Sequence, residues 1–173
     1  IIKVLPFNEK HLTDKYVSWL NDSEITRYSE QRHRTHTLDT TTAYYEAQRV
    51  SPDLFLAIET LDPEPAHIGN MRVFFMPDNK SASLSIILGD KKYWRVGIAS
   101  RAWQMTLDAL LGELGVRLVI AAAMEVNIPM IRLMKRTGMN IDGTLPKRFI
   151  WEGREVGMVW ASKSSTVNVL ENN

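Results

Sequence analysis

One segment of the sequence could bind a phosphate group with its own backbone. Residues 84–88 are apolar, residues 89–95 form a short basic loop, and a long helical pattern begins at Ile98. The first turn of a helix has about four backbone N–H groups without partners and carries the positive end of the helix dipole. Gly97 lets a ligand approach the backbone and Ala99 keeps the first turn small, a geometry that binds phosphate or pyrophosphate. The alternative, that Gly97 only permits a tight turn, stays open.

A second group of residues strengthens the phosphate interpretation. Arg132, Lys135 and Arg136 have the spacing of one helix face, and Asn127 stands just before that helix. A basic face beside an anion-binding helix start suits a ligand with several phosphates. The ordinary alternatives are a solvated surface face for the cations and a plain helix cap for Asn127.

Composition narrows the function classes. The chain has 173 residues, about one domain, and it has no cysteine. A disulfide scaffold, a thiolate metal site and a cysteine nucleophile are therefore excluded. The formal net charge of +1 argues against a nucleic-acid binder. His33 and His36 are three residues apart, but no acidic residue stands at the usual ligand positions, so no metal site is predicted.

Several known site patterns are missing from the sequence. It has no glycine-rich dinucleotide or Walker-type phosphate loop and no Gly-x-Ser-x-Gly elbow. The apolar stretch at residues 118–124 is too short to span a bilayer, and residues 1–5 do not resemble a signal peptide. The chain does not begin with Met, so a removed leader stays open. We expect a cytoplasmic protein that acts neither on nucleic acid nor on a membrane.

Hydrophobic periodicity and capping residues predict the elements that must position these residues. We expect helices from Asn8 to Leu20, from Asp22 towards Tyr28, after residues 35–37, at 98–114 and at 128–137. We expect strands at residues 1–5, 54–59, 67–76, 84–88 and 118–123, the last buried on both faces, and a hairpin of residues 149–151 and 155–160. Strands outnumber helices in the middle of the chain, which indicates an α+β fold. Residues 1–163 are predicted to form one domain and residues 164–173 a polar, disordered tail.

The pattern from Tyr93 to Ala99, the long helix, the buried strand, and Asn127 followed by Gly138 and Met139 resemble the GNAT superfamily of N-acetyltransferases. The resemblance implies a mixed, mostly antiparallel central sheet flanked by helices. Residues 19–28 and 67–70 look like the Rim-type branch, which includes ribosomal-protein and bacterial amino-sugar acetyltransferases. Residues 28–36 look closer to the sugar-modifying members.

The resemblance also implies acetyl-CoA as cosubstrate and a site for it. Backbone amides of the loop and helix start would hold the coenzyme pyrophosphate, and the strand before them would bind the pantetheine by its main chain. Asn127 would contact the pantetheine, and Arg132 and Lys135 would lie near the cofactor. The residues of the loop and strand are Ile86, Ile87, Leu88, Trp94, Arg95, Val96, Gly97, Ile98, Ala99 and Ser100.

The catalytic groups are less evident. Without cysteine, direct attack of an amine on the thioester is the preferred route, and a base that accepts the amine proton contributes about 10²–10⁴-fold. At the position where many relatives carry a tyrosine that acts as the general acid, this chain has Met134, which has no proton to donate. Glu125 and Glu30 are the candidate catalytic residues, with ordinary surface or hydrogen-bonded carboxylates as the alternative.

Tyr28, Arg32 and His36 are the candidate acceptor-binding residues, because an aromatic ring suits a sugar and arginine suits a diphosphate. The alternative is packing between helices for Tyr28 and exposure to solvent for the other two. The leading hypothesis is N-acetylation of an amino sugar, either free or linked to a nucleotide. The alternatives are acetylation of a protein N-terminus or a small amine, and a non-catalytic coenzyme A-binding module. The C-terminal hairpin could also pair two subunits into a homodimer.

Overall fold

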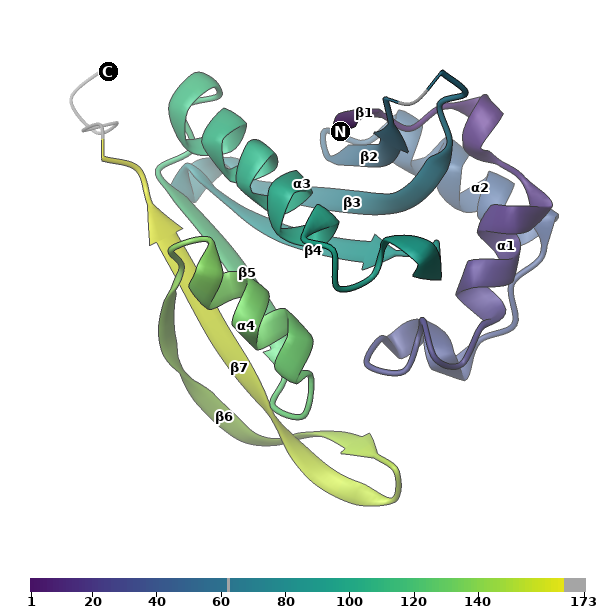
Figure 1. Ribbon diagram of the computed structural model, residues 1–173. Coiled ribbons are helices and arrows are strands. Elements are labelled where there is room, and N and C mark those ends of the chain that lie inside the picture. Colours follow the sequence, from purple (N-terminus) through teal and green to yellow (C-terminus); the bar gives the residue numbers. More distant parts are fainter. Residues whose placement is uncertain (62, 167–173) are drawn as a thin grey trace. The chain divides into compact units, whose positions relative to one another are not determined.

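The computed structural model describes residues 1–61 and 63–166, and it places seven strands in one sheet (Figure 1). The strand order is β1-β2-β3-β4-β5-β7-β6. β4 and β5 pair in parallel, whereas β1 with β2, β2 with β3, β5 with β7 and β6 with β7 pair antiparallel. Four α-helices accompany this sheet in the described residues. The predicted α+β class with a mixed, mostly antiparallel sheet is confirmed.

The chain divides into two compact units. Unit 1 comprises Ile1–Val73 and Ile86–Ala102. It holds β1 (Ile2–Pro6), α1 (Asp14–Asn21), α2 (Leu38–Arg49), β2 (Leu54–Thr60), most of β3 (His67–Met76), the end of β4 (Ser81–Leu88) and the start of α3 (Ile98–Asp108). Three 3₁₀ turns also belong to it: η1 (Glu9–His11), η2 (Glu30–His33) and η4 (Lys91–Tyr93).

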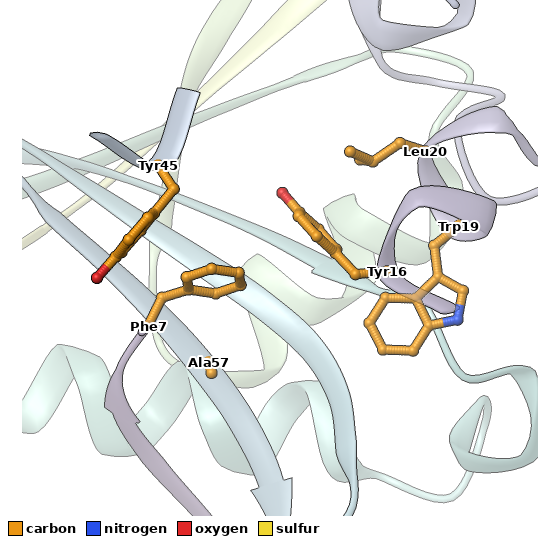
Figure 2. Close-up of a cluster of buried hydrophobic side chains, with 6 residues drawn as sticks. All are labelled: Phe7, Tyr16, Trp19, Leu20, Tyr45 and Ala57. Atoms are coloured by element: carbon orange, nitrogen blue, oxygen red, sulfur yellow. The ribbon is translucent and has the colours of Figure 1, made fainter. Parts of the chain in front are cut away.

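Aromatic side chains form the core of unit 1. The Phe7 ring lies between Tyr16 and Tyr45, with ring centroids 5.4 and 5.6 Å away (Figure 2). Trp19, Leu20 and Ala57 complete the buried cluster. Burying a large apolar side chain contributes about 1.5–3 kcal/mol, so this cluster is a main anchor of α1 and α2 on the sheet.

The helix predicted from Asn8 to Leu20 is two elements instead of one. Asn8 caps η1, the chain leaves helical geometry at Leu12, and Thr13 caps α1 anew by accepting from the amide of Tyr16. The break brings the buried His11 side chain to Glu59, a partner 48 residues away. A long-range contact of this kind overrides local helix periodicity.

The short helix predicted from Asp22 towards Tyr28 is also absent. The chain makes turns there, in which the Asp22 carboxylate accepts from the amide of Glu24, and then forms η2. The helix predicted after residues 35–37 is confirmed, because Thr37 caps α2 with a complete capping box.

Unit 2 comprises Phe74–Ser85 and the residues from Trp103 onward. It contains η3 (Pro77–Asn79), a π-helical turn η5 (Ala109–Glu113), β5 (Leu118–Met124), α4 (Ile128–Arg136), β6 (Asn140–Trp151) and β7 (Arg154–Ser164). Trp103, Leu107, Leu110 and Met134 are among its fully buried side chains. The helix predicted at 98–114 thus ends as α3 at Asp108 and continues as the π-helical turn.

Three further sequence expectations are adjusted in unit 2. The predicted hairpin is confirmed, but β6 and β7 are much longer than expected and β6 is mostly exposed (Figure 1). β5 is not buried on both faces, because Ala122 is exposed between buried neighbours. β7 runs to Ser164, the first residue of the predicted tail, and residues 167–173 lie outside the described part of the chain.

Among the described residues, no helix is long and apolar enough to cross a membrane.

Candidate functional site

The segment after β4, residues 89–97, contains the turn predicted to bind the coenzyme and is called the coenzyme loop. The amides of Gly89 and Asp90 both donate to the Ile68 carbonyl, at 2.9 and 3.0 Å, which ties the loop to β3. A Cβ on Gly89 would collide with the Trp19 ring, so only glycine fits between the loop and α1. Asp90 then caps η4 by accepting from the amide of Lys92. The loop therefore starts from a fixed position.

The second half of the coenzyme loop turns into α3 through two residues with positive φ, Arg95 at 64° and Gly97 at 86°. The Gly97 carbonyl accepts the first hydrogen bond of the helix, from the amide of Arg101 at 3.0 Å. The amides of Ile98, Ala99 and Ser100 precede that bond, so they have no acceptor inside the helix. A Cβ placed on Gly97 would meet nothing within 4 Å. The backbone at this turn is therefore open to an anion, which is what a pyrophosphate needs.

The last residues of β4 lead into this loop. The ladder between β4 and β5 includes only Ser81–Ser83, so it stops before Ile86. Ile86, Ile87 and Leu88 are half-buried. The Leu88 carbonyl accepts from the indole nitrogen of Trp94 at 2.8 Å. The main-chain groups of Ile86 and Ile87 are thus not paired with β5. A strand that binds a ligand by its backbone needs such unpaired groups.

The predicted acceptor-binding residues lie in residues 22–36, which are called here the acceptor segment. Arg32 donates to the Ser29 carbonyl at 2.8 Å and to the Glu30 carboxylate at 2.9 Å. The guanidinium of Arg27 lies over the Tyr28 ring, 5.5 Å from its centroid. At the end of the segment, His36 exchanges two main-chain hydrogen bonds with the Asn21 side chain. Glu30, the candidate base, is therefore engaged by Arg32.

Lys91 connects the acceptor segment to the coenzyme loop, a contact that no pattern in the sequence predicts. Its ammonium lies 2.8 Å from the Asp22 carboxylate and 2.6 Å from that of Glu24. The hydrogen bond from Lys91 holds the pKa of Asp22 below its usual value, and the same contact with Asp22 raises the pKa of Lys91. Beside it, Lys15 of α1 pairs with Asp90 at 2.8 Å.

The remaining predicted site residues belong to unit 2. Asn127 caps α4, its side-chain oxygen accepting from the amide of Met130. Arg132 and Lys135 are exposed on α4. Glu125 follows β5, and its carboxylate accepts from the amide of Gly157 at 2.6 Å. Met134 is fully buried, so its side chain does not contact solvent.

The structure therefore brings together two of the predicted groups within unit 1, the stretch of residues 86–100 that is predicted to bind the coenzyme and the acceptor segment. The groups of unit 2, around Glu125, Asn127 and α4, form their own cluster after β5. No group of three or more histidine, cysteine, aspartate or glutamate side chains that could hold a metal ion occurs in the described residues.

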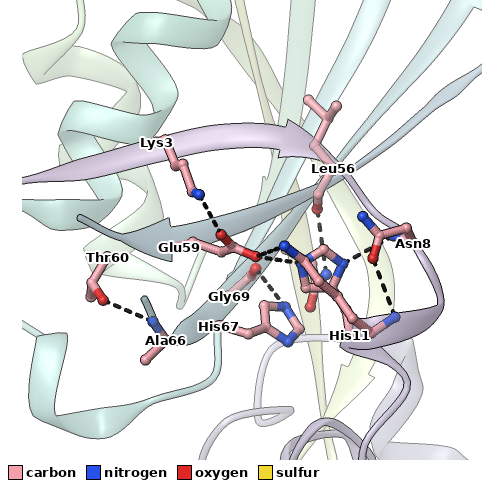
Figure 3. A network of polar contacts seen from close by, with 11 residues as sticks. Lys3, Asn8, His11, Leu56, Glu59, Thr60, Ala66, His67 and Gly69 are labelled. Atoms are coloured by element: carbon pink, nitrogen blue, oxygen red, sulfur yellow. Dashed lines mark hydrogen bonds and ion pairs between the residues drawn. The ribbon is translucent and has the colours of Figure 1, made fainter. Parts of the chain in front are cut away.

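A second polar cluster in unit 1 surrounds Glu59 (Figure 3). His11 donates to the Glu59 carboxylate at 2.7 Å while its other ring nitrogen accepts from the amide of Asn8. Lys3 and Lys10 pair with the same carboxylate at 2.9 and 3.0 Å. A cavity of about 220 Å³ adjoins these residues and His67. Both ring nitrogens of His11 already have hydrogen-bond partners, so His11 is not a free base. The cluster is a buried carboxylate surrounded by the groups that neutralise it.

Comparison with known proteins identifies the class. A family model described as an acetyltransferase (GNAT) domain matches residues 2–140. That is more than half of the chain, so the chain belongs to the GNAT acetyltransferase family. It is an acetyl-CoA-dependent N-acetyltransferase, which confirms the resemblance and the enzyme class predicted from sequence. The Rim-type branch, the cytoplasmic location and the homodimer stay predictions.

Solved structures share the fold at low sequence identity. Spermidine N-acetyltransferase from Vibrio cholerae, in complex with CoA and spermine, has a TM-score of 0.84 and 17% identity over 95% of both chains. A GNAT-family acetyltransferase from Bacillus anthracis has a TM-score of 0.81 and 17% identity over 95% of both chains. An N-acetyltransferase from Staphylococcus aureus Mu50 has a TM-score of 0.79 and 17% identity, over 95% of this chain and 98% of the other. None of the curated proteins compared matches the sequence.

Proposed function

We propose that this acetyltransferase transfers the acetyl group of acetyl-CoA directly to the primary amine of an amino sugar, in particular one linked to a nucleotide or another anionic group. The coenzyme would lie with its pyrophosphate on the backbone amides of residues 95–100. The open space above Gly97 and the helix amides without internal acceptors support this placement.

The other contacts with the coenzyme follow the same assignment. Main-chain groups of Ile86, Ile87 and Leu88 would bind the pantetheine arm. In unit 2, the side chain of Asn127 is the further residue that we propose for the coenzyme. The exposed cations Arg132 and Lys135 would lie near the coenzyme phosphates. Because the Leu88 carbonyl already accepts from Trp94, Ile86 and Ile87 are the better candidates for the pantetheine contacts.

Acetyl-CoA supplies an activated thioester. The amine nitrogen of the acceptor attacks the carbonyl carbon, a carbon–nitrogen bond forms, and the carbon–sulfur bond breaks. One proton leaves the nitrogen for a base or for water, and the departing coenzyme thiolate takes up a proton. A main-chain N–H on the end of β4 would stabilise the negative charge that develops on the carbonyl oxygen.

Glu30 and Glu125 remain the candidate proton acceptors. The carboxylate of Glu30 is paired with Arg32, and that of Glu125 accepts from the Gly157 amide. In each residue only one of the two carboxylate oxygens makes these hydrogen bonds. The other oxygen could therefore still accept a proton through a water molecule. Positioning of the two substrates supplies several kcal/mol in addition.

One observation carries the choice of acceptor. Every carboxylate of the acceptor segment is matched by a cation: Asp22 and Glu24 by Lys91, and Glu30 by Arg32. A polyamine acceptor has several ammonium groups and would have to displace these cations from their carboxylates. An anionic acceptor would instead gain from the arginines of the segment, which bind phosphates in a bidentate manner.

The second candidate acceptor is a small polyamine, with a protein N-terminus as a third. The polyamine is favoured by the fold shared with the spermidine N-acetyltransferase of Vibrio cholerae, whose structure holds spermine. At 17% identity the likeness concerns the fold, whereas acceptor choice depends on the side chains of the site.

The release of coenzyme A thiol across a panel of acceptors tests the proposal. The panel contains nucleotide-linked amino sugars, free amino sugars, spermidine and peptides with free N-termini. We expect the largest kcat/KM for a nucleotide-linked amino sugar, and Arg32→Ala should lower it about tenfold while Arg49→Ala, on α2, does not. A larger kcat/KM for spermidine or for a peptide would overturn the amino-sugar assignment.

A further inference from the structure

We infer that Lys91 is a positioning residue that couples coenzyme binding to the order of the acceptor segment. This inference rests on the proposed roles of the coenzyme loop and of the acceptor segment. It concerns a residue that touches neither reacting group and acts through the segments that it joins.

Lys91 lies in the coenzyme loop between two residues that are bonded to the strands beside it. It opens η4, immediately after Asp90, which is bonded to the Ile68 carbonyl and paired with Lys15. Three residues further on, Trp94 is bonded to the Leu88 carbonyl and lies 5.8 Å from the Lys91 ammonium. Lys91 is thus held between two fixed points, directly before the turn that receives the pyrophosphate.

On its other side, the Lys91 ammonium pairs with two carboxylates of the acceptor segment. Asp22 uses one carboxylate oxygen to accept from the amides of Glu24 and Ile25, which shapes the turn after α1. Its other oxygen faces the Lys91 ammonium, which also reaches Glu24. The start of the acceptor segment is therefore attached to the coenzyme loop by one shared ammonium group.

The far end of the acceptor segment is closed as well. The Asn21 side chain donates to the His36 carbonyl and accepts from the His36 amide, both at 2.8 Å. Residues 22–36 thus form a loop whose ends lie together beside the end of α1. A constraint at Asp22 and Glu24 acts on the whole loop, because its ends are joined.

The ion pairs around Lys91 are too exposed to serve stability. The Lys91 side chain is 42% exposed, Asp22 33% and Glu24 63%, and exposed pairs contribute little to unfolding free energy. What the shared ammonium does is restrict where the acceptor segment can lie relative to the coenzyme loop. When coenzyme A binds and further restricts the motion of the turn after Lys91, the restriction reaches the acceptor segment through the shared ammonium, and acceptor binding then needs less ordering of its own.

Hydrogen exchange with and without coenzyme A tests the coupling without any acceptor. In the wild-type protein, saturating coenzyme A should slow the exchange of amides in residues 22–36 by about threefold or more. In Lys91→Met this protection should fall below about 1.5-fold, while the protection of residues 95–100 remains. Lys92→Met is the matched control, because Lys92 is the next residue of the same turn, and it should keep both protections. Lys91→Arg should restore the coupling, since its guanidinium can also bridge two carboxylates.

The outcomes separate the inference from the proposed function. If coenzyme A binds neither the wild type nor the variants in calorimetry, the proposed coenzyme site is wrong. If coenzyme A binds and protects residues 22–36 equally in the wild type and in Lys91→Met, the role of Lys91 is wrong and the coenzyme site stands.

Steady-state kinetics gives a second readout once an acceptor is found. Lys91→Met should raise the acceptor KM about three- to tenfold, as expected for the loss of two exposed ion pairs. The KM for acetyl-CoA should change less than about twofold. An equal rise of both KM values, or a loss of kcat alone, would contradict a positioning role.

Discussion

The indole nitrogen of Trp94 donates a hydrogen bond to the main-chain carbonyl of Leu88, at 2.8 Å. The bond joins the last residue of β4 to the residue that precedes the positive-φ turn of the coenzyme loop. A loop that must present backbone amides to a ligand gains from such a bond, because the ordering cost is then met before the ligand arrives.

Replacement of Trp94 by phenylalanine removes this bond and keeps an aromatic ring. A single hydrogen bond is worth about 0.5–1.5 kcal/mol, so the affinity for coenzyme A should fall about two- to tenfold in calorimetry. Trp160→Phe is the control, since the indole nitrogen of Trp160 has no partner among the described residues. Equal affinities of Trp94→Phe and wild type would show that the bond does not organise the site.

Gly97→Val should abolish coenzyme A binding and leave the fold largely intact. A Cβ added at Gly97 would meet no protein atom within 4 Å, but φ at this residue is 86° and the new side chain would extend into the space proposed for the pyrophosphate. A β-branched residue with positive φ adds strain of about 1–3 kcal/mol. Calorimetry and circular dichroism measure the two effects. The control is Gly112→Val, because a Cβ added at Gly112 also meets no atom within 4 Å beyond its neighbours in the chain. Unchanged affinity of Gly97→Val would refute the phosphate-binding role.

Acid should destabilise the protein through the Glu59 cluster. Burial alone raises the pKa of Glu59, but hydrogen bonds from Lys3, His11 and Lys10 outweigh it and lower the pKa to about 2. The folded-state pKa lies below the unfolded value, so the contribution is present above the unfolded pKa and is lost as the pH falls towards 2. The loss is on the order of 2–3 kcal/mol. In Glu59→Gln, the free energy of unfolding should change less across this range in urea titrations.

His67 adds a separate window at higher pH. Burial, and then the nearby His11, lowers the pKa of His67 to about 4. The unfolded chain therefore binds the proton first, and stability should already decline as the pH falls from the ordinary histidine pKa towards 4. His67→Gln should reduce that early decline and keep the later one. His11, whose pKa is also lowered by burial, contributes to the same window. An identical pH profile for wild type and both variants would contradict these assignments.

The two candidate bases are separated by their amide variants. We expect either Glu30→Gln or Glu125→Gln to lower kcat by about 10²-fold or more, with the affinity for acetyl-CoA unchanged. Either amide can still accept a hydrogen bond, so the contacts with Arg32 and with the Gly157 amide are largely kept. The kcat values across pH identify the base, because the variant without it should lose the rise of kcat with pH. A loss below about threefold in both variants would exclude both residues.

Helices and strands with strong local signals could be predicted from the sequence, whereas those that depend on distant partners could not. Pro129 in the first turn and Gly138 after the last mark α4 correctly, and Gly138 indeed has a φ of 76°. β6 was predicted only at its end. Gly143, Pro146 and several charged residues obscure its alternation, and it forms a strand because β7 supplies its hydrogen bonds.

The coenzyme site shows the same division within a few residues. Gly97, the helix start and the apolar strand before them are neighbours in the chain, so the sequence by itself predicts a turn that could bind phosphate. Together with Asn127, Gly138 and Met139, this pattern carries the resemblance that indicates the enzyme class. The contacts of Lys91 with Asp22 and of His11 with Glu59 join residues 69 and 48 positions apart. Only the tertiary structure decided these contacts, because burial and charge select partners among groups that meet after the sheet and α1 have packed.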